Sequence, residues 1–355
     1  MTTPDPPDPT PQVVTEALRA AGHDVTVREL SSEPVGTGQM GESRRLHLTF
    51  AGDPGDAPAT LVAKLPSGPR ERRAAVAGTF RTEVEFYRRI AATVAVRAPR
   101  CWHAWISDDA VDFLLLLEDL APAHQGDQIL GCGAAEAVAA ARNLAGLHGP
   151  RWCDPTLRDD GLEPPDPDSA GMLGDLLRPM TERFVERFAD RLDPADRDVL
   201  TAVPQVAGEW LLGRLERFGP VHGDYRLDNL MFHPDGEVTA LDWQTLSLGL
   251  PARDLAYLCS TSLDVQLRRS CEAEVVEAYH RALTDEASWG RGVTGYDLDA
   301  CFDDYRYAML QAPLIIVLGW AVGTPTERGD EMFLAMARRS AAAIRDHDPF
   351  PMIGR

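Results

Sequence analysis

The feature that most constrains this chain is a short polar run, His222 to Asn229, with the sequence HGDYRLDN. Asp224 and Asn229 lie five residues apart in it, and Asp242 follows thirteen residues after Asn229. Phosphoryl transfer from ATP requires an Asp that positions a hydroxyl nucleophile, together with an Asn and a second Asp that bind Mg²⁺. These residue types, in this order, therefore predict a phosphoryl-transfer site.

The residues between Asn229 and Asp242 give the spacing a structural reason. Leu230 to Leu241 reads as two short strands around a Pro-Asp-Gly turn at residues 234–236. Such a hairpin would bring Asp242 back beside Asn229. The predicted chemistry and the predicted local structure therefore agree.

A second signal is the use of lysine. Of 35 basic residues, Lys64 is the only lysine, and all the others are arginine. It follows Ala59 to Ala63, an apolar run that reads as a buried strand. Arginine cannot replace lysine where a compact ammonium must reach between phosphates. Lys64 is therefore predicted to contact the α- and β-phosphates of a nucleotide, as a Val-Ala-Lys sequence at a strand end does in kinases.

Such a lysine needs a carboxylate partner from the helix that follows. The apolar residues of that helix form one stripe at helical spacing: Phe80, Val84, Tyr87 and Ile90. Glu83 lies within the stripe, whereas Glu85 points to roughly the opposite side. A carboxylate in an apolar stripe needs a partner that offsets its desolvation. Glu83 is therefore predicted to pair with Lys64, and Glu85 to be a solvated surface charge.

A glycine-rich loop precedes the lysine. Gly36, Gly38 and Gly41 fit the Gly-x-Gly-x-x-Gly pattern of loops that cover nucleotide phosphates. The flanking segments, Val25 to Leu30 and Leu46 to Phe50, both alternate like strands. Because the loop joins two strands and does not open a helix, it is typical of a kinase and not of a dinucleotide-binding fold. Glycine permits the close backbone approach that such a loop requires.

The pattern His-Gly-Asp, four residues, Asn and a later hydrophobic-Asp pair resembles the catalytic core of the aminoglycoside phosphotransferase and choline kinase superfamily. The resemblance implies a protein-kinase-like α+β fold with two lobes, a small antiparallel-sheet N-lobe and a mostly helical C-lobe. It implies that Asp224 is the catalytic residue and that Asn229 and Asp242 bind Mg²⁺. His222 would brace the loop.

The resemblance also implies a hinge after the apolar run Phe113 to Leu117. There the Glu118 carbonyl and the Leu120 amide would pair with the adenine ring, and Leu117 would lie beside it. An ordinary core strand and its exit turn fit the same residues, since backbone contacts leave no trace in the side chains.

Two other features fit the superfamily. Gly126 to Cys132, with a helix that ends at His148 and Trp152 nearby, resembles the ecdysteroid-kinase-like (CHK kinase-like) branch. His148 is expected to pack at the helix end. In the segment Gly249 to Ala256, Asp254 is expected to be a structural, helix-capping brace.

The predicted organisation follows from these motifs. Residues 1–11, rich in Pro and Asp, form a disordered tail. Residues 12–117 form the N-lobe, which binds nucleotide, and residues 118–121 form the hinge. Residues 122–355 form the C-lobe, which holds the catalytic hairpin and the substrate-binding helices.

Composition limits the partners and the location. A net charge of −20 argues against nucleic acid or an anionic membrane as a partner. No uninterrupted apolar run approaches eighteen residues, and no signal peptide is recognisable. The six cysteines show no Cys-x-x-Cys pair, so neither zinc nor disulfides are expected. These features predict a cytoplasmic protein without a membrane or nucleic-acid partner, and they leave its oligomeric state open.

The predicted activity is transfer of the γ-phosphoryl group from ATP to a hydroxyl of a small molecule, with Mg²⁺. GTP is an alternative donor, and an antibiotic, a sugar, an amino alcohol or a lipophilic alcohol are alternative acceptors. The acidic residues between Asp297 and Asp304 could meet an amine, whereas nearby aromatic residues could line an apolar pocket. The main alternative is a catalytically silent nucleotide-binding or interaction module of the same fold. A protein kinase is disfavoured because Trp and Gln, and not Phe and Gly, follow Asp242.

Overall fold

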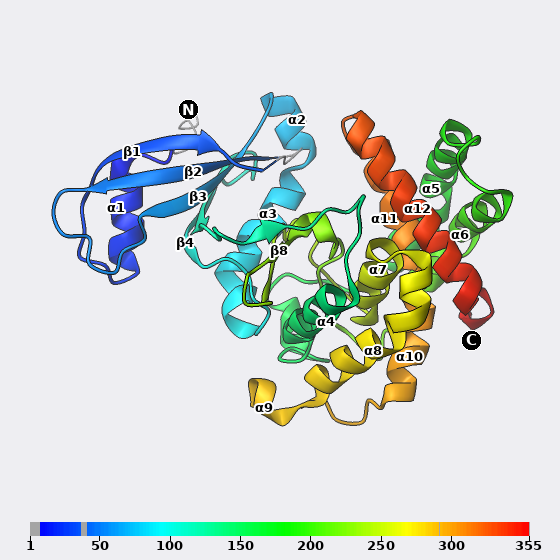
Figure 1. Cartoon of the computed structure of the whole chain (residues 1–355). Helices are drawn as coiled ribbons and strands as arrows, with labels where there is room; N and C mark the ends of the chain where they lie inside the picture. Colours follow the sequence, from blue (N-terminus) through cyan, green and yellow to red (C-terminus); the bar gives the residue numbers. More distant parts are fainter. Residues whose placement is uncertain (1–7, 37–40, 291, 355) are drawn as a thin grey trace. The chain divides into compact units, whose positions relative to one another are not determined.

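The computed structural model describes residues 8–36, 41–290 and 292–354. They form two compact units, which are coloured along the sequence in Figure 1. Unit 1 comprises the described residues up to Ala92, with Ala98–Ala121 and Asp242–Thr245. Unit 2 comprises Thr93–Arg97, Pro122–Leu241 and the described residues from Leu246 onward. The chain therefore passes from unit 2 to unit 1 between Leu241 and Asp242.

Unit 1 is built on an antiparallel five-stranded sheet with the strand order β1-β2-β3-β5-β4. Its strands are β1 (Val27–Pro34), β2 (Gly41–Phe50), β3 (Thr60–Pro66), β4 (Cys101–Ile106) and β5 (Phe113–Glu118). Its helices are α1 (Pro11–Ala20), α2 (Arg70–Ala75) and α3 (Ala77–Glu85).

The apolar run in β5 is buried on both faces of the sheet. Leu114 and Leu116 pack into a cluster with residues of α1, whereas Phe113 and Leu115 pack into a second cluster with α3. Successive side chains of a strand point to opposite faces, so a strand covered on both sides must be apolar at every position. This explains why the run shows no alternation of apolar and polar residues.

Four elements of unit 1 differ from the predicted ones. The strands expected at residues 25–30 and 46–50 extend toward the glycine loop as β1 and β2. Lys64 lies inside β3, two residues before the strand ends, and not at its end. The helix that carries Glu83 changes after Glu85 into a π-helical turn, Phe86–Ile90.

Unit 2 is mostly helical. Its helices are α4 (Ala134–His148), α5 (Pro167–Arg187), α6 (Pro194–Leu212), α7 (Ala252–Ser262), α8 (Val265–Thr284), α9 (Glu286–Trp289), α10 (Leu298–Tyr307), α11 (Gln311–Val322) and α12 (Glu327–His347). Its strands are β6 (His124–Gln125), β7 (Gly219–Val221), β8 (Leu230–Phe232), β9 (Val238–Ala240) and β10 (Ser247–Gly249). An apolar core cluster contains residues of α5, α6, α7, α11 and α12.

Helices α5 and α6 lie side by side in Figure 1 and approach each other closely at two glycines. A Cβ on Gly174 would lie 2.4 Å from the Pro204 carbonyl oxygen, and one on Gly208 would lie 2.4 Å from that of Ala170. Only glycine permits such an approach. The two pairs run in opposite directions along the sequence, so the helices are antiparallel.

The predicted hairpin after Asn229 is present in unit 2. Strands β8 and β9 pair antiparallel, with Leu230 opposite Ala240, and β6 lies on the other side of β8. Gly236 adopts φ +86° in the turn, a conformation that glycine favours. The turn residues and the strand pattern were therefore sufficient to predict this element.

Within the described residues, one continuous helical stretch, Leu298–Val322, is long and apolar enough to cross a membrane, judged by length and composition. It comprises α10, a 3₁₀ turn and α11. Of the 18-residue part of this stretch that is apolar enough, 61% is buried inside the protein. Core helices meet the same criteria, so this stretch alone does not indicate a membrane span.

Candidate functional site

In unit 1, Lys64 lies between two carboxylates. Its Nζ is 2.7 Å from Oε1 of Glu83 and 3.2 Å from Oδ1 of Asp242. The Glu83 side chain is buried, with 1% exposed, and its Oε2 accepts a 3.2 Å hydrogen bond from Nε2 of Gln244. Both oxygens of Glu83 are therefore bound, which is what a buried carboxylate requires.

Burial and the charges of the neighbouring groups act together on the pKa values in this cluster. Burial alone would lower the pKa of Lys64, but the carboxylates of Asp242 and Glu83 outweigh it and raise that pKa above its ordinary value. Burial raises the pKa of Glu83 and Asp242 adds to this effect, whereas Lys64 opposes it. Lys64 is therefore a fixed ammonium at neutral pH, as a phosphate-binding lysine must be.

The neighbouring carboxylate, Glu85, has different partners. It pairs with Arg88 at 3.1 Å and with Arg89 at 2.7 Å along its own helix. The structure thus places Glu83, and not Glu85, beside Lys64. This is the arrangement that the position of Glu83 in the apolar stripe predicts.

The segment after Leu241 is anchored by an aromatic pair. The buried ring of Trp243 stacks on Phe86, with ring centroids 3.7 Å apart and an angle of 7° between the planes. Phe86 is the first residue of the π-helical turn. Asp242 adopts φ +61°, a conformation that Asp tolerates better than most residues. The stacked pair therefore fixes the backbone from which Asp242 reaches Lys64.

The glycine loop is described only at its two ends. Gly36 adopts φ +77°, and Gly38 lies outside the described residues. Gly41 begins β2, and a Cβ added to it would lie 3.1 Å from the Leu65 carbonyl oxygen. Glycine at position 41 thus permits a close approach beside the strand that carries Lys64. A role of the loop in nucleotide binding stays a prediction.

The predicted hinge residues lie at the end of β5. Glu118 is its last residue, and its side chain accepts a 3.1 Å hydrogen bond from the Arg100 backbone. Leu120 is buried, with 8% exposed. Between them, Asp119 accepts hydrogen bonds of 2.7 and 3.2 Å from Arg45. The turn is therefore held rigidly, and pairing of its backbone with a purine stays a prediction.

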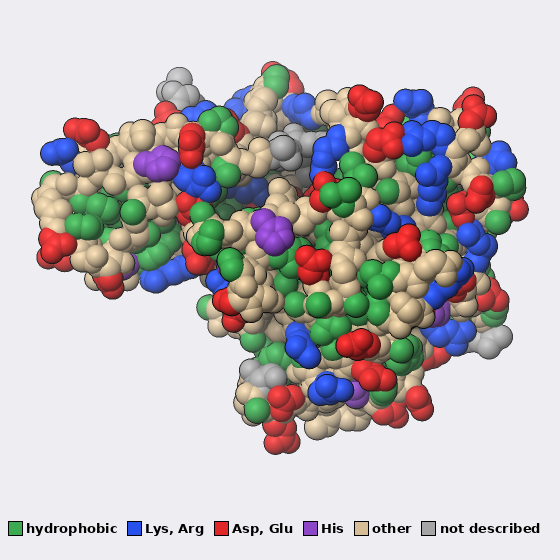
Figure 2. Space-filling model, in the orientation of Figure 1, with side chains coloured by type: hydrophobic (Ala, Val, Ile, Leu, Met, Phe, Trp, Pro, Cys, Tyr) green, Lys and Arg blue, Asp and Glu red, His purple; other side chains and the backbone are tan. Residues whose placement is uncertain are grey.

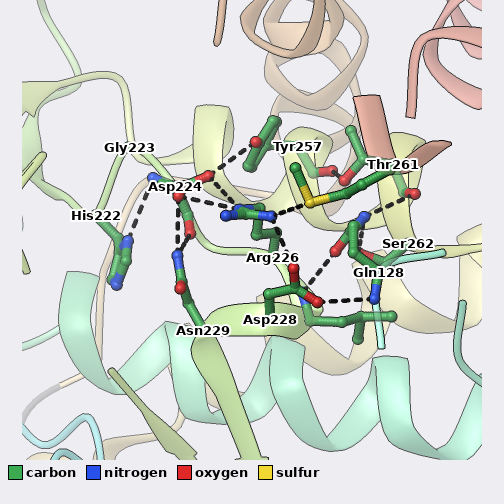
Figure 3. Close-up of polar contacts among 12 residues, drawn as sticks. Gln128, His222, Gly223, Asp224, Arg226, Asp228, Asn229, Tyr257, Thr261 and Ser262 are labelled. Carbon is green, nitrogen blue, oxygen red and sulfur yellow. Dashed lines mark hydrogen bonds and ion pairs between the residues drawn. The ribbon is translucent and has the colours of Figure 1, made fainter. Parts of the chain in front are cut away.

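In unit 2, Asp224 and Asn229 are in direct contact (Figure 3). Nδ2 of Asn229 is 2.9 Å from both the carbonyl oxygen and Oδ2 of Asp224. Both partners are acceptors, so the amide nitrogen must face them and Oδ1 must point elsewhere. An amide oxygen is a suitable ligand for Mg²⁺. Asn229 can therefore brace Asp224 and still offer an oxygen to a metal ion.

Two further partners of Asp224 escaped prediction from the sequence. The Tyr257 hydroxyl, on α7, donates to Oδ1 at 2.9 Å, and Nε of Arg226 donates to Oδ2 at 3.1 Å. The position of Arg226 between two acidic residues, Asp224 and Asp228, was a usable signal. Tyr257 gave no such signal, since it lies 33 residues away in the chain.

The loop itself is braced by His222 and Asp254 (Figure 3 shows His222). Nε2 of His222 lies 2.9 Å from the Leu241 carbonyl oxygen, and its Nδ1 accepts from the Asp224 amide at 3.3 Å. The fully buried Asp254 accepts from the backbone amides of His222 at 2.6 Å and Gly223 at 2.9 Å. Asp254 therefore binds the loop, whereas the expected role was a helix cap.

His148 packs at the end of its helix, as expected. It is the last residue of α4 and is fully buried. Its Nδ1 lies 2.8 Å from the Tyr279 hydroxyl, and its Nε2 lies 3.3 Å from Asp254. Its contacts are those of a structural residue behind the loop.

Of the acidic residues between Asp297 and Asp304, Asp304 is not available to an amine. Asp304 is fully buried and is bound by Arg214 and Arg217, each at 2.6 Å. Asp297 accepts a 2.8 Å hydrogen bond from the Ala300 amide as the N-cap of α10. The partners of Asp304 lie almost ninety residues earlier, so the sequence pattern could not reveal them.

Unit 2 has a pocket of about 480 Å³ where α5, the end of α11 and the start of α12 meet. Its lining includes Arg183, Arg187, Trp320, Asp330 and Phe333. Arg187 pairs with Asp330 at 2.8 Å, and Nε1 of Trp320 donates to Asp330 at 3.0 Å. The pocket therefore combines aromatic surface with the ion pair of Arg187 and Asp330.

Comparison with known proteins settles the family. The pattern described as the phosphotransferase enzyme family, APH, matches residues 47–291, more than half of the chain. The chain belongs to this family. The resemblance drawn from the catalytic motif is thereby confirmed at the level of the family. The assignment to the ecdysteroid-kinase-like branch stays a prediction.

Solved structures confirm the fold class of this phosphotransferase. The GDP complex of wild-type aminoglycoside 2'-phosphotransferase-IIIa has a TM-score of 0.51 and 15% identity, over 93% of this chain and 98% of that one. The ethanolamine kinase of Plasmodium vivax has a TM-score of 0.50 and 11% identity, over 90% of this chain and 84% of that one. At such identities the similarity shows the kinase-like α+β fold alone.

Curated relatives match shorter segments of the phosphotransferase. Acyl-CoA dehydrogenase family member 10 of Mus musculus is 40% identical over 97 residues, which is 26% of this chain and 9% of that protein. Acyl-CoA dehydrogenase family member 11 of Homo sapiens is 33% identical over 82 residues, which is 21% of this chain and 10% of that protein. The matches thus span about a tenth of the length of these relatives.

Proposed function

We propose that this phosphotransferase moves the γ-phosphoryl group of ATP to a hydroxyl of a small molecule, with Mg²⁺. The observation that carries the proposal is the contact of Lys64, the only lysine of the chain, with both Glu83 and Asp242. A lysine held in this way is a preformed partner for nucleotide phosphates. In this proposal residues 12–117 form the nucleotide-binding lobe, residues 118–121 the hinge and residues 122–355 the substrate-binding lobe.

The residues present fit a magnesium ion. The carboxylate of Asp242 and the amide oxygen of Asn229 are hard oxygen ligands. Within the described residues, no group of three or more His, Cys, Asp or Glu side chains could hold a metal by itself. This suits Mg²⁺, which proteins usually bind through one or two side chains and the phosphates of the substrate. When bound, the ion would neutralise charge on the β- and γ-phosphates.

The remaining roles follow from this assignment. Gly36, Gly38 and Gly41 would cover the phosphates, while the Glu118 carbonyl and the Leu120 amide would pair with the purine. Adenine and guanine differ in their hydrogen-bonding groups at that edge of the ring. GTP therefore stays an alternative phosphoryl donor. Asp224 would take the proton of the acceptor hydroxyl as its oxygen bonds to the γ-phosphorus and the bond to ADP breaks.

For the acceptor, the charges near Asp224 favour a neutral or lipophilic alcohol over a polycation. Asp224 and Asp228 are balanced by Arg226 and by Arg328, of which 52% is exposed. Figure 2 shows acidic and basic side chains interspersed over the visible face. A polycationic acceptor would need an excess of acidic groups around Asp224 itself. Since the curated relatives are named acyl-CoA dehydrogenases, hydroxyacyl compounds belong among the acceptors to test.

The proposal is tested by a screen for ADP release from Mg·ATP across hydroxylated compounds. The panel contains lipophilic alcohols, hydroxyacyl compounds, sugars, amino alcohols and aminoglycoside and macrolide antibiotics. We expect ADP formation that depends on one acceptor class and on Mg²⁺. If ATP binds but no acceptor stimulates its turnover, the alternative of a silent nucleotide-binding module gains support.

Nucleotide binding at Lys64 gives a second prediction. An ATP analogue with an amine-reactive acyl phosphate should label Lys64, and excess Mg·ATP should protect it. A free amine reagent should label Lys64 poorly, because the raised pKa keeps its ammonium protonated. Peptide mass spectrometry reads both results, and a Lys64→Arg variant is the control. Labelling confined to the N-terminal amine and insensitive to ATP would contradict the assignment.

A further inference from the structure

The carboxylate of Asp224 is bound by three donors from unit 2 (Figure 3). Nδ2 of Asn229 lies 2.9 Å from Oδ2, and the Tyr257 hydroxyl lies 2.9 Å from Oδ1. Nε of Arg226 lies 3.1 Å from Oδ2 and 3.0 Å from Oδ1. A carboxylate offers about four lone-pair sites. Three donors therefore leave it about one site for a fourth partner, and 21% of the side chain remains exposed.

Tyr257 is fixed by packing. Only 1% of it is exposed, and it belongs to the same apolar cluster as Phe184, Ile316 and Met332. Burial raises its pKa well above the ordinary value, and the charge of Asp224 adds to this effect. The hydroxyl is therefore a neutral donor that points at Asp224 from a rigid ring.

Arg226 is held at both ends of its guanidinium. Its Nη1 lies 3.2 Å from Oδ2 of Asp228 and 2.8 Å from the sulfur of Met332. Asp228 also accepts a 3.0 Å hydrogen bond from the Gln128 amide, and it pairs with Arg328 at 3.2 Å. Arg226 thus connects Asp224 to a charge that several other elements of unit 2 hold in place.

We propose that Tyr257 and Arg226 are positioning residues, which hold the Asp224 carboxylate so that its remaining lone pair meets the acceptor hydroxyl. A base must lie within hydrogen-bond reach of the proton that it takes, and small misplacements lower the rate strongly. A hydrogen bond from Asn229 alone would hold the carboxylate at Oδ2, and the group could still rotate. Since this role requires a catalytic Asp224, it rests on the proposed function.

The test begins with Tyr257→Phe, which removes one hydroxyl and keeps the ring in the cluster. We expect kcat to fall about ten- to hundredfold, as for one lost hydrogen bond to a charged group. KM for ATP should not change, because Tyr257 has no role in nucleotide binding. The matched control is Tyr305→Phe, which removes a buried hydroxyl that donates to Glu272 at 2.9 Å. It should keep wild-type kcat.

Introducing Tyr257→Phe or Arg226→Gln into an Asp224→Asn background separates a positioning role from a structural one. If Tyr257 acts through the carboxylate, Tyr257→Phe should cause little further loss there, and Arg226→Gln should behave alike. A wild-type kcat for Tyr257→Phe, or an equal loss in both backgrounds, would overturn the positioning role and leave the kinase assignment standing. Wild-type turnover by Asp224→Asn itself would overturn the proposed function and the positioning role with it.

Discussion

Replacing Asp224 by Asn should lower turnover by about 10²–10⁴-fold and leave the affinity for ATP nearly unchanged. The proposed role of Asp224 is to take the proton of the acceptor, and the nucleotide is assigned to other residues. Part of the loss should come from positioning, because the transition state of phosphoryl transfer is loose. The NH₂ group of an Asn at position 224 would also face the hydrogen-bond donors of Asn229, Arg226 and Tyr257.

The measurement is steady-state turnover on an acceptor from the screen, together with ATP binding by calorimetry. Asp297→Asn is the matched control, because Asp297 is an exposed N-cap of α10 and Asn serves equally well there. Asp228→Asn should have a smaller effect than Asp224→Asn. Wild-type turnover by Asp224→Asn would show that the proposed mechanism is wrong.

Replacing Asp242 by Asn should weaken Mg²⁺-dependent nucleotide binding and lower turnover. The carboxylate is the proposed metal ligand, and an amide is a poorer one for Mg²⁺. Its charge also offsets that of Lys64, 3.2 Å away. We expect the Mg²⁺ concentration for half-maximal activity to rise by about tenfold or more. Replacing a residue that only hydrogen-bonds to a metal ligand already lowers metal affinity by about that factor.

A magnesium titration of ATP binding and of turnover provides the measurement. The matched control is Glu85→Gln, which also neutralises a carboxylate of unit 1 but one that pairs with Arg88 and Arg89. It should titrate like the wild type. If Asp242→Asn does so too, Asp242 is not part of the metal site.

The contacts that the sequence could predict are those set by local periodicity. The position of Glu83 in an apolar stripe selects it over Glu85, because a helix fixes which residues share a face. The hairpin after Asn229 follows from a turn of Pro, Asp and Gly between two apolar runs. The ends of β1 and β2 were harder to place, since strand length depends on the pairing partner and not only on the residues of the strand.

Contacts set by tertiary packing could not be predicted. Tyr257 reaches Asp224 because α7 packs behind the loop, and no sequence spacing indicates this. Asp304 pairs with Arg214 and Arg217, which lie in another segment of the chain, and the acidic pattern around Asp304 does not indicate these pairs. The role of Asp254 was predicted only in part. A structural role was expected, but its partners, the backbone amides of His222 and Gly223, lie about thirty residues earlier in the chain.

The most direct measurement traces the oxygen of the acceptor. An acceptor from the screen is prepared with a heavy oxygen isotope in its hydroxyl group, and the product is analysed by mass spectrometry. If the γ-phosphoryl group is transferred to that hydroxyl, the phosphate ester keeps the heavy oxygen, and one ADP forms for each ester. ADP and inorganic phosphate without a phosphorylated acceptor, or an ester that has lost the heavy oxygen, would contradict the proposed function.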